Sequence, residues 1–348
     1  MIKNFVAAVP NYNYRVRKIA QEQPSYFRTE IFYNLLNNCK KLLLKLINCQ
    51  NGRATFLTAS GTGAMNASVI NLTNNKDKIL IINGGRFGKR WIEICSYYHR
   101  NYKTFNTEFG KNIDLKLLEQ NIQKIKPTFI LMQHNETSAM QLFPVEQIGK
   151  ICHQYNIKLL VDAISSFGIE KYQMNKWNVY ATIISTNKGI GTYPGLSCIV
   201  LSQNAQLHNS SDYYFDLTKY IDNYKNALLP FTPNIISIKQ LNYQLNYFNR
   251  IGLDTIIHKI HNRAILFRTL IKKLPLQIIA ETPSNCGTAL YTCRNDVMDL
   301  FDTLQKKNIY FAPEGGKTGK KLIISHIGEQ TNADVYLIVE ELKKWLKK

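Results

Sequence analysis

Residues 128–165 read TFILMQHNETSAMQLFPVEQIGKICHQYNIKLLVDAIS, and the fold class can be inferred from them. Apolar runs at 128–133 and 158–161 are each long enough for one buried strand. Between these runs, apolar residues recur at helical spacing from Val145 through Ile148 to Tyr155. Strand, helix and strand in this order predict two parallel strands joined by a crossover helix.

The same alternation of short apolar runs and helical patterns extends over about residues 54 to 201. Strands that are apolar along their whole length are buried on both faces, which is typical of parallel sheets covered by helices. We therefore predict an α/β fold with a mainly parallel, seven-stranded sheet between layers of helices. The predicted strands are Ala54–Thr58, Ile79–Asn83, Tyr102–Phe105, Thr128–Gln133, Lys158–Val161, Ala181–Ser185 and Ser197–Leu201.

The segments outside this region have other patterns. Residues 28–49 predict one long helix before the sheet, and residues 235–273 predict another after it. The tail from residue 277 combines two predicted strands with two predicted helices, which indicates a smaller α+β unit. We predict a large domain over residues 1–250, with an N-terminal arm and helix at 1–50, and a small C-terminal domain over residues 251–348.

The composition indicates a folded protein without a membrane partner. The chain has 348 residues, of which 45% are hydrophobic, and no apolar run approaches the roughly 20 residues that span a bilayer. The N-terminus has no signal-peptide core, so we expect a cytoplasmic protein. Seven cysteines without metal-ligand spacing are expected to be reduced packing thiols, and no metal site is predicted.

The formal net charge of +20 would suit a nucleic-acid or membrane-surface protein. However, the lysines are scattered, and the chain is also rich in Asn, Ile and Tyr, a bias typical of a low-GC genome. We therefore expect no nucleic-acid partner, and the charge is compatible with anionic substrates.

Polar residues at the ends of the predicted strands form the candidate site, because ligands bind there in open α/β sheets. Ser60-Gly61-Thr62-Gly63 joins a strand to a helix and could present N–H groups to a phosphate, although small residues at such a turn often serve only packing. Asp162 follows a buried strand and needs a cationic partner, or else caps a helix. Lys188 follows another strand, where desolvation could make its amine nucleophilic, or it simply reaches solvent.

Two further segments complete this set. His134-Asn135-Glu136-Thr137-Ser138 closes a buried strand with polar side chains, and Phe87 lies between glycines where its ring could stack on a planar group. A phosphate cradle, an aromatic plate, an acid for a ring nitrogen and a lysine for an aldehyde are together what pyridoxal 5′-phosphate requires.

Over residues 54–202 the chain resembles the class V, fold-type I aminotransferases, most closely the branch of 2-aminoethylphosphonate–pyruvate transaminase and alanine–glyoxylate aminotransferase. The resemblance rests on SGTGAM at 60–65, GRFGKRW at 85–91, HNETS at 134–138, VDAISSFG at 161–168 and STNKGIGTYPG at 185–195. As in that branch, 26 positions separate Glu136 from Asp162 and again Asp162 from Lys188.

The resemblance implies a role for each matching residue. Lys188 would bind the cofactor as a Schiff base and transfer the proton, and Asp162 would pair with the ring nitrogen. Thr232 would serve the phosphate of a neighbouring subunit, so a homodimer is expected. The remaining cofactor contacts implied are Ser60, Gly61, Thr62 and Asn187 at the phosphate, Phe87 and Ile164 at the two ring faces, and Thr137 at the ring oxygen.

The substrate side departs from the family pattern. Ile323 stands where the family carries an arginine for the substrate's acid group, and Ala8-Val9-Pro10 replaces the usual Pro-Gly-Pro entry. Either another cation binds the acid group in place of this arginine, or one of the substrates lacks the usual acid group. The candidates for such a cation are Arg28, His326, Lys317 and Lys320, and of these we assign Arg28 and His326 to the substrate.

These features together predict an aminotransferase that moves an amino group between a small amine or amino acid, such as 2-aminoethylphosphonate, and a 2-oxo acid such as pyruvate. Two alternatives remain open: a lyase or decarboxylase with the same cofactor, and a non-enzymatic cofactor-binding protein.

Overall fold

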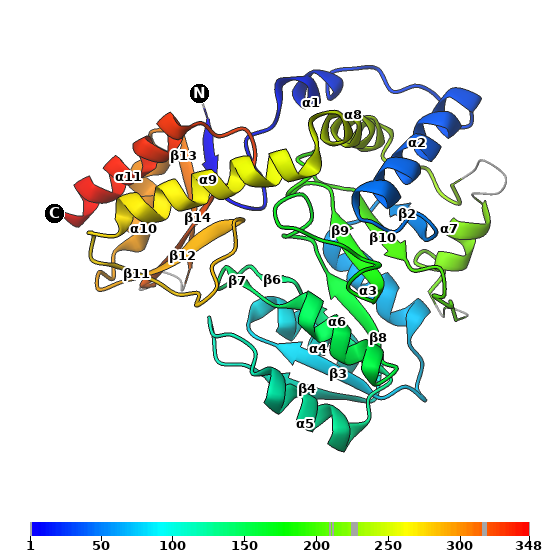
Figure 1. Ribbon diagram of the computed structural model, residues 1–348. Helices are drawn as coiled ribbons and strands as arrows, with labels where there is room; N and C mark the ends of the chain where they lie inside the picture. The colour runs from blue at the N-terminus through cyan, green and yellow to red at the C-terminus, as the bar shows by residue number, and fades with distance from the viewer. Residues whose placement is uncertain (1, 209, 211, 224–228, 315–318, 348) are drawn as a thin grey trace.

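Two β-sheets organise the chain, and each forms one lobe of the molecule (Figure 1). The computed structural model describes residues 2–208, 210, 212–223, 229–314 and 319–347. Within this part of the chain, no helix is long and apolar enough to cross a membrane.

The larger sheet has seven strands in the order β2-β10-β9-β8-β5-β3-β4. Only β10 runs antiparallel to its neighbours, β2 and β9; the other pairs are parallel, which confirms the predicted sheet. The carboxyl ends of β5, β8 and β9 therefore meet at one edge. The strands are β2 (Arg53–Leu57), β3 (Ile79–Asn83), β4 (Tyr102–Asn106), β5 (Phe129–Gln133), β8 (Lys158–Asp162), β9 (Val179–Ser185) and β10 (Ser197–Leu201).

Helices cover this sheet because their apolar stripes need burial. In α6, Val145, Ile148 and Cys152 are buried and the helix packs on β8, as the spacing predicted. Side-chain caps fix several helix starts; Thr29, for example, accepts a hydrogen bond from the Phe32 N–H. The helices are α1 (Tyr14–Ile19), α2 (Glu30–Leu46), α3 (Gly61–Leu72), α4 (Arg86–Tyr97), α5 (Leu115–Ile125), α6 (Val145–Gln154) and α7 (Leu217–Asn223).

The prediction of one long helix over residues 235–273 is wrong in one respect, because the structure has two helices there. α8 spans Ile235–Ile251 and α9 spans Leu253–Ile271. Gly252 lies between them with a φ of +89°, a left-handed conformation that ends a helix and favours glycine.

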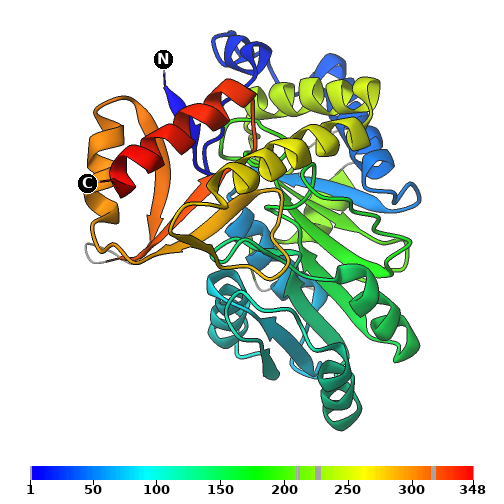
Figure 2. The same cartoon turned by 60° about the vertical axis from the view of Figure 1, so that its left-hand side comes forward.

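The smaller sheet has five strands in the order β1-β13-β14-β12-β11. β1 pairs with β13 in parallel, and the other pairs are antiparallel. Figure 2 shows α9 and α11 lying along this lobe, and both contribute to its hydrophobic core. The elements are β1 (Lys3–Phe5), β11 (Leu276–Ile278), β12 (Gly287–Thr292), β13 (Ile309–Glu314), β14 (Lys321–Ser325), α10 (Val297–Gln305) and α11 (Asn332–Leu346), with a separate hairpin of β6 (Asn135–Glu136) and β7 (Gln141–Leu142) near the large sheet.

The division into domains at residues 250 and 251 remains a proposal. Supporting it, the break at Gly252 separates α8, which packs on α1 and α2, from α9, which packs on α11 and β12. One observation departs from it, because the N-terminal strand β1 belongs to the smaller sheet. The N-terminal arm therefore starts in one lobe and reaches the other.

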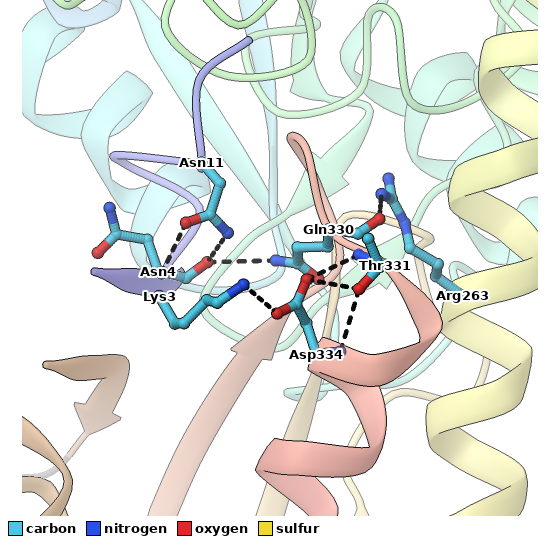
Figure 3. A network of polar contacts seen from close by, with 7 residues as sticks. All are labelled: Lys3, Asn4, Asn11, Arg263, Gln330, Thr331 and Asp334. Atoms are coloured by element: carbon cyan, nitrogen blue, oxygen red, sulfur yellow. Dashed lines mark hydrogen bonds and ion pairs between the residues drawn. The ribbon is translucent and has the colours of Figure 1, made fainter. Parts of the chain in front are cut away.

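The start of this arm is anchored by a polar network (Figure 3). Lys3 Nζ lies 2.5 Å from Asp334 Oδ1. The side-chain amide of Asn11 bonds the backbone N–H and C=O of Asn4, both at 3.0 Å, and Gln330 Nε2 donates to the same carbonyl at 3.2 Å. These bonds hold the segment from β1 to Asn11 in place at the smaller sheet.

Candidate active site

Asp162 and Lys188 lie together at the carboxyl edge of the large sheet. Asp162 is the last residue of β8, and Lys188 follows the end of the neighbouring strand β9. Each charged group shifts the pKa of the other, so the two side chains share one electrostatic environment. The structure thus brings together the two groups on which the predicted chemistry depends.

Asp162 is a buried carboxylate, only 5% exposed. Burial raises the pKa of its carboxyl from 3.8 to about 7, while the Ile164 N–H, at 2.8 Å from Oδ1, and the positive charges of Lys188 and Arg90 lower it. A buried acid of this kind is stabilised as an anion when a cationic group lies beside it. The site therefore favours a positively charged ligand group at Asp162.

Burial lowers the pKa of the Lys188 amine below its ordinary value, and Arg90 acts in the same direction, while Cys286 and Asp162 raise it. A lowered pKa increases the fraction of neutral amine, which is the nucleophilic form. The Lys188 Nζ lies 5.9 Å from the centroid of the Phe87 ring. Amine, aromatic plate and carboxylate thus occupy one region.

The predicted phosphate cradle is the N-terminus of α3. Ser60 is its N-cap and accepts a hydrogen bond from the Gly63 N–H at 3.3 Å. A Cβ on Gly61 would lie 2.5 Å from Ile164 Cδ1, so a larger residue there would require the Ile164 side chain to move. Arg90 Nη1 donates to Thr62 Oγ1 at 3.1 Å. A helix N-terminus with a guanidinium beside it is suited to an anion.

Glu136 fixes the position of Phe87. It is fully buried, and its Oε2 accepts hydrogen bonds from the backbone N–H groups of Phe87 and Gly88, both at 3.1 Å. These are N–H groups of the first turn of α4, which have no partner within the helix. Its Oε1 accepts from the Ser138 hydroxyl at 2.6 Å. The aromatic plate is thereby tied to the loop after β5.

Two other predicted residues lie in this cluster. Thr137 Oγ1 is 2.7 Å from Ser165 Oγ, which places it beside the loop after Asp162. Asn187 accepts a hydrogen bond from the Ser185 hydroxyl at 2.6 Å, and its Nδ2 donates to the Ala8 carbonyl at 2.8 Å. Asn187 thus links the N-terminal arm to the residue next to Lys188, and its contact with a phosphate stays a prediction.

Three predicted residues have no contact with Asp162, Lys188 or Phe87 among the interactions of the described residues. Thr232 and Arg28 are exposed, and Arg28 lies over the Phe27 ring. His326 is buried, its Nε2 is 2.8 Å from Thr288 Oγ1, and burial holds its pKa well below the ordinary value, so the ring is neutral. This environment does not support His326 as a substrate contact.

The substrate side is apolar where the family arginine was expected. Ile323 is buried in a cluster that also contains Ala7, Met140, Ile169 and Cys286. Of the other candidate cations, Lys320 is exposed and Lys317 lies outside the described residues.

Glu136 and Arg90 belong to the matching motifs, but no role was predicted for either residue from the sequence. A carboxylate directly after a buried strand signals a required partner, which here is the first turn of α4. Arg90 lies three positions after Phe87, hence on the same face of α4, and its guanidinium carbon is 4.8 Å from the Phe87 ring centroid. Helical spacing could have identified it.

The residues present fit pyridoxal phosphate. A buried acid with a raised pKa suits a cationic ring nitrogen, a desolvated lysine suits an aldehyde, and the N-terminus of α3 suits a phosphate. Among the described residues, no cluster of three or more His, Cys, Asp or Glu side chains could hold a metal ion.

Comparisons with known proteins agree with this site. The family described as "Aminotransferase class-V" matches residues 22–309. The "Soluble hydrogenase 42 kDa subunit" of Anabaena cylindrica is 26% identical, with 92% of this chain and 87% of that protein covered. The bifunctional phosphonoacetaldehyde hydrolase/aminoethylphosphonate transaminase of Clostridioides difficile is 30% identical over 49% of this chain and 28% of its own.

The structure of an alanine–glyoxylate aminotransferase from Nostoc sp. superposes with a TM-score of 0.93 at 20% identity, covering 100% of this chain and 95% of that one. This likeness shows the fold-type I architecture. The chain therefore belongs to the class-V aminotransferase family, as a transaminase that depends on pyridoxal phosphate.

Proposed function

We propose that this enzyme transfers an amino group between a small amine or amino acid, such as 2-aminoethylphosphonate, and a 2-oxo acid such as pyruvate. The observation that carries the proposal is the placement of Lys188 beside both Asp162 and the Phe87 ring at the sheet edge. A similarity to the C. difficile protein over part of the chain supports a phosphonate amine as one substrate.

In this proposal, each residue acts through the contacts described above. Ser60, Gly61 and Thr62 hold the phosphate at the N-terminus of α3, with Arg90 adding positive charge through its bond to Thr62. When bound, the cofactor supplies an electron-accepting ring that stabilises negative charge on the substrate carbon next to the nitrogen.

The protein groups around the ring orient it and move the proton. Asp162 supplies the anion opposite the ring nitrogen, and Phe87 and Ile164 cover the ring faces. Burial lowers the pKa of the Lys188 amine and so increases the fraction of neutral Nζ, the form that accepts a proton, and Lys188 carries the proton during transfer. Thr137 binds at the ring oxygen and Asn187 at the phosphate.

A half-reaction tests this function. The cofactor-loaded protein is mixed with 2-aminoethylphosphonate, alanine or serine without an oxo acid, and the visible absorption band of the cofactor is followed. An aminotransferase loses the band in proportion to the amine consumed, and pyruvate restores it. Product release with the band intact identifies a lyase or decarboxylase, and no conversion with any amine contradicts catalysis of this class.

We further propose a homodimer, in which Thr232 reaches the phosphate site of the second copy. The support is an aromatic cluster beside this residue: Tyr214 stacks on Phe231 at 4.9 Å, and Tyr213 is 75% exposed. An apolar surface of this kind is typical of an interface.

Light scattering at micromolar concentration should give twice the 40.2 kDa of one chain. A mass of one chain at all concentrations would contradict the dimer. The proposed partners are therefore the substrates and a second copy of the chain. A cytoplasmic location is also proposed, since all seven cysteines are free thiols and six of them are buried.

A further inference from the structure

Strand β14 presents two chemically different faces. Leu322 and Ile324 point into the core of the smaller sheet. Ile323 packs on the other side, with Ala7 and Met140. Because side chains alternate along a strand, Lys321 shares the face of Ile323. A lysine at the start of β14 is thereby directed toward the large sheet.

The contacts of Lys321 confirm this direction. Its Nζ donates to the Ser138 carbonyl at 3.2 Å, so it reaches the loop that also carries Thr137. It lies 3.8 Å from Glu314 Oε2 and 4.8 Å from the Phe109 ring centroid. The side chain is only 17% exposed, and burial lowers the pKa of its amine. An ammonium has three N–H donors, so Lys321 retains one for a ligand beside its contacts with Ser138 and Glu314.

Arg86 lies beside this lysine. Its backbone N–H donates to the Ser138 hydroxyl at 3.2 Å, and its guanidinium forms an ion pair with Glu314. Two cations therefore share one carboxylate. Glu136, the other acid near Lys321, already accepts N–H groups from the first turn of α4. Glu314 therefore pairs with both cations, while Glu136 acts on Lys321 only through its charge and forms its hydrogen bonds elsewhere.

This cation pair lies at the edge of the active site. Arg86 directly precedes Phe87, whose ring is 5.9 Å from Lys188 Nζ, and Lys321 bonds the residue after Thr137. The segments that carry or contact the two cations therefore also carry Phe87 and Thr137 of the candidate site. A carboxylate or phosphonate is the chemical group that two adjacent cations recognise.

We propose that Lys321 and Arg86 form an anion-binding subsite for the acid group at the end of the amino substrate remote from the reacting nitrogen. This inference rests on the proposed function and narrows its substrate class to amines that carry such an acid. The apolar cluster around Ile323 borders the subsite and carries no charge. Selectivity for the acid therefore depends on the neighbouring lysine rather than on position 323.

Calorimetric titration of the cofactor-loaded protein with ethylphosphonate tests the subsite without requiring turnover. Lys321→Met should weaken ethylphosphonate binding about tenfold or more, and Lys321→Arg should retain most of it because the charge remains. Arg86→Met, at an exposed side chain, should weaken it in the same direction. Lys306→Met removes an exposed lysine that directly follows α10 in the same lobe and should leave binding within about twofold.

Equal affinity in the wild type, Lys321→Met and Arg86→Met would overturn the proposal. Equal weakening by Lys306→Met would also overturn it, since the effect would then reflect net charge alone. In the half-reaction, Lys321→Met should lower kcat/KM for 2-aminoethylphosphonate, mainly through KM, and leave propylamine unchanged. If no amine reacts at all, the proposed function fails, while the titration still decides whether the anion subsite exists.

Discussion

Replacing Lys188 by methionine should lower the rate of the amino-transfer half-reaction by about 10³-fold or more, the range expected for loss of a nucleophile and proton carrier. The amine lies beside Asp162 and over the Phe87 ring, where the other described residues cannot take over both of its tasks. The measurement is the single-turnover loss of the cofactor band with saturating amine. Lys176→Met, at an exposed lysine nearby in sequence, should react like the wild type.

The same substitution should not destabilise the cofactor-free protein near neutral pH. Because burial lowers the folded-state pKa of Lys188, the unfolded chain binds more protons between the two pKa values, and stability rises with pH in that window. Below it, the charged lysine opposes folding, and methionine removes this penalty. A large loss of unfolding free energy in Lys188→Met would show that the lysine is structural, and full activity would exclude it from the chemistry.

The large sheet could be predicted from the sequence because its strands are buried on both faces. Runs such as Ile79–Asn83 and Ser197–Leu201 carry the hydrophobic signal within themselves, and both are strands with these bounds. The smaller sheet was only partly predictable. β1 and β11 have three residues each and lie at its edges, where short strands have little periodicity.

The helix break at Gly252 shows a limit of periodicity. The apolar pattern continues across α8 and α9, so it indicates one helix. The turn instead depends on the left-handed φ that this glycine adopts between two packing environments. A single glycine is tolerated in many helices, and its effect here follows from tertiary contacts.

The site could be predicted where a reactive side chain stands at or just after the carboxyl end of a buried strand, as at Asp162 and Lys188. It was not predictable where a residue's neighbours come from distant segments. His326 looks polar and available in the sequence, but it is enclosed beside Thr288 and Phe267. Lys321 lies in none of the motifs that the sequence offers. Its side-chain direction can be inferred only when the two faces of β14 are known, because side chains alternate between them.

Replacing Asp162 by asparagine should lower the half-reaction rate by about 10²- to 10³-fold, because the neutral amide cannot stabilise a cationic ring nitrogen as the carboxylate does. The cofactor should also protect the variant less against unfolding than it protects the wild type. The measurements are the single-turnover rate and the rise in Tm on adding the cofactor. Asp302→Asn, at an exposed acid on α10, should change neither quantity.

The cofactor-free proteins should also differ in pH dependence. Asp162 has a folded pKa of about 7 against an ordinary value of 3.8, so between these values the folded state holds a proton that the unfolded state has lost. Folding then takes up a proton, and raising the pH from about 4 to about 7 weakens the fold, by an amount on the order of 4 kcal/mol at the upper end. Asparagine does not titrate, so Asp162→Asn should be the more stable protein at pH 8 and should lose this slope in urea unfolding. The unfolding free energies of the two proteins could instead differ by the same amount from pH 4 to pH 8. The pKa of Asp162 would then not be raised in the folded state, and the proposed electrostatic basis of cofactor binding at this sheet edge would be wrong.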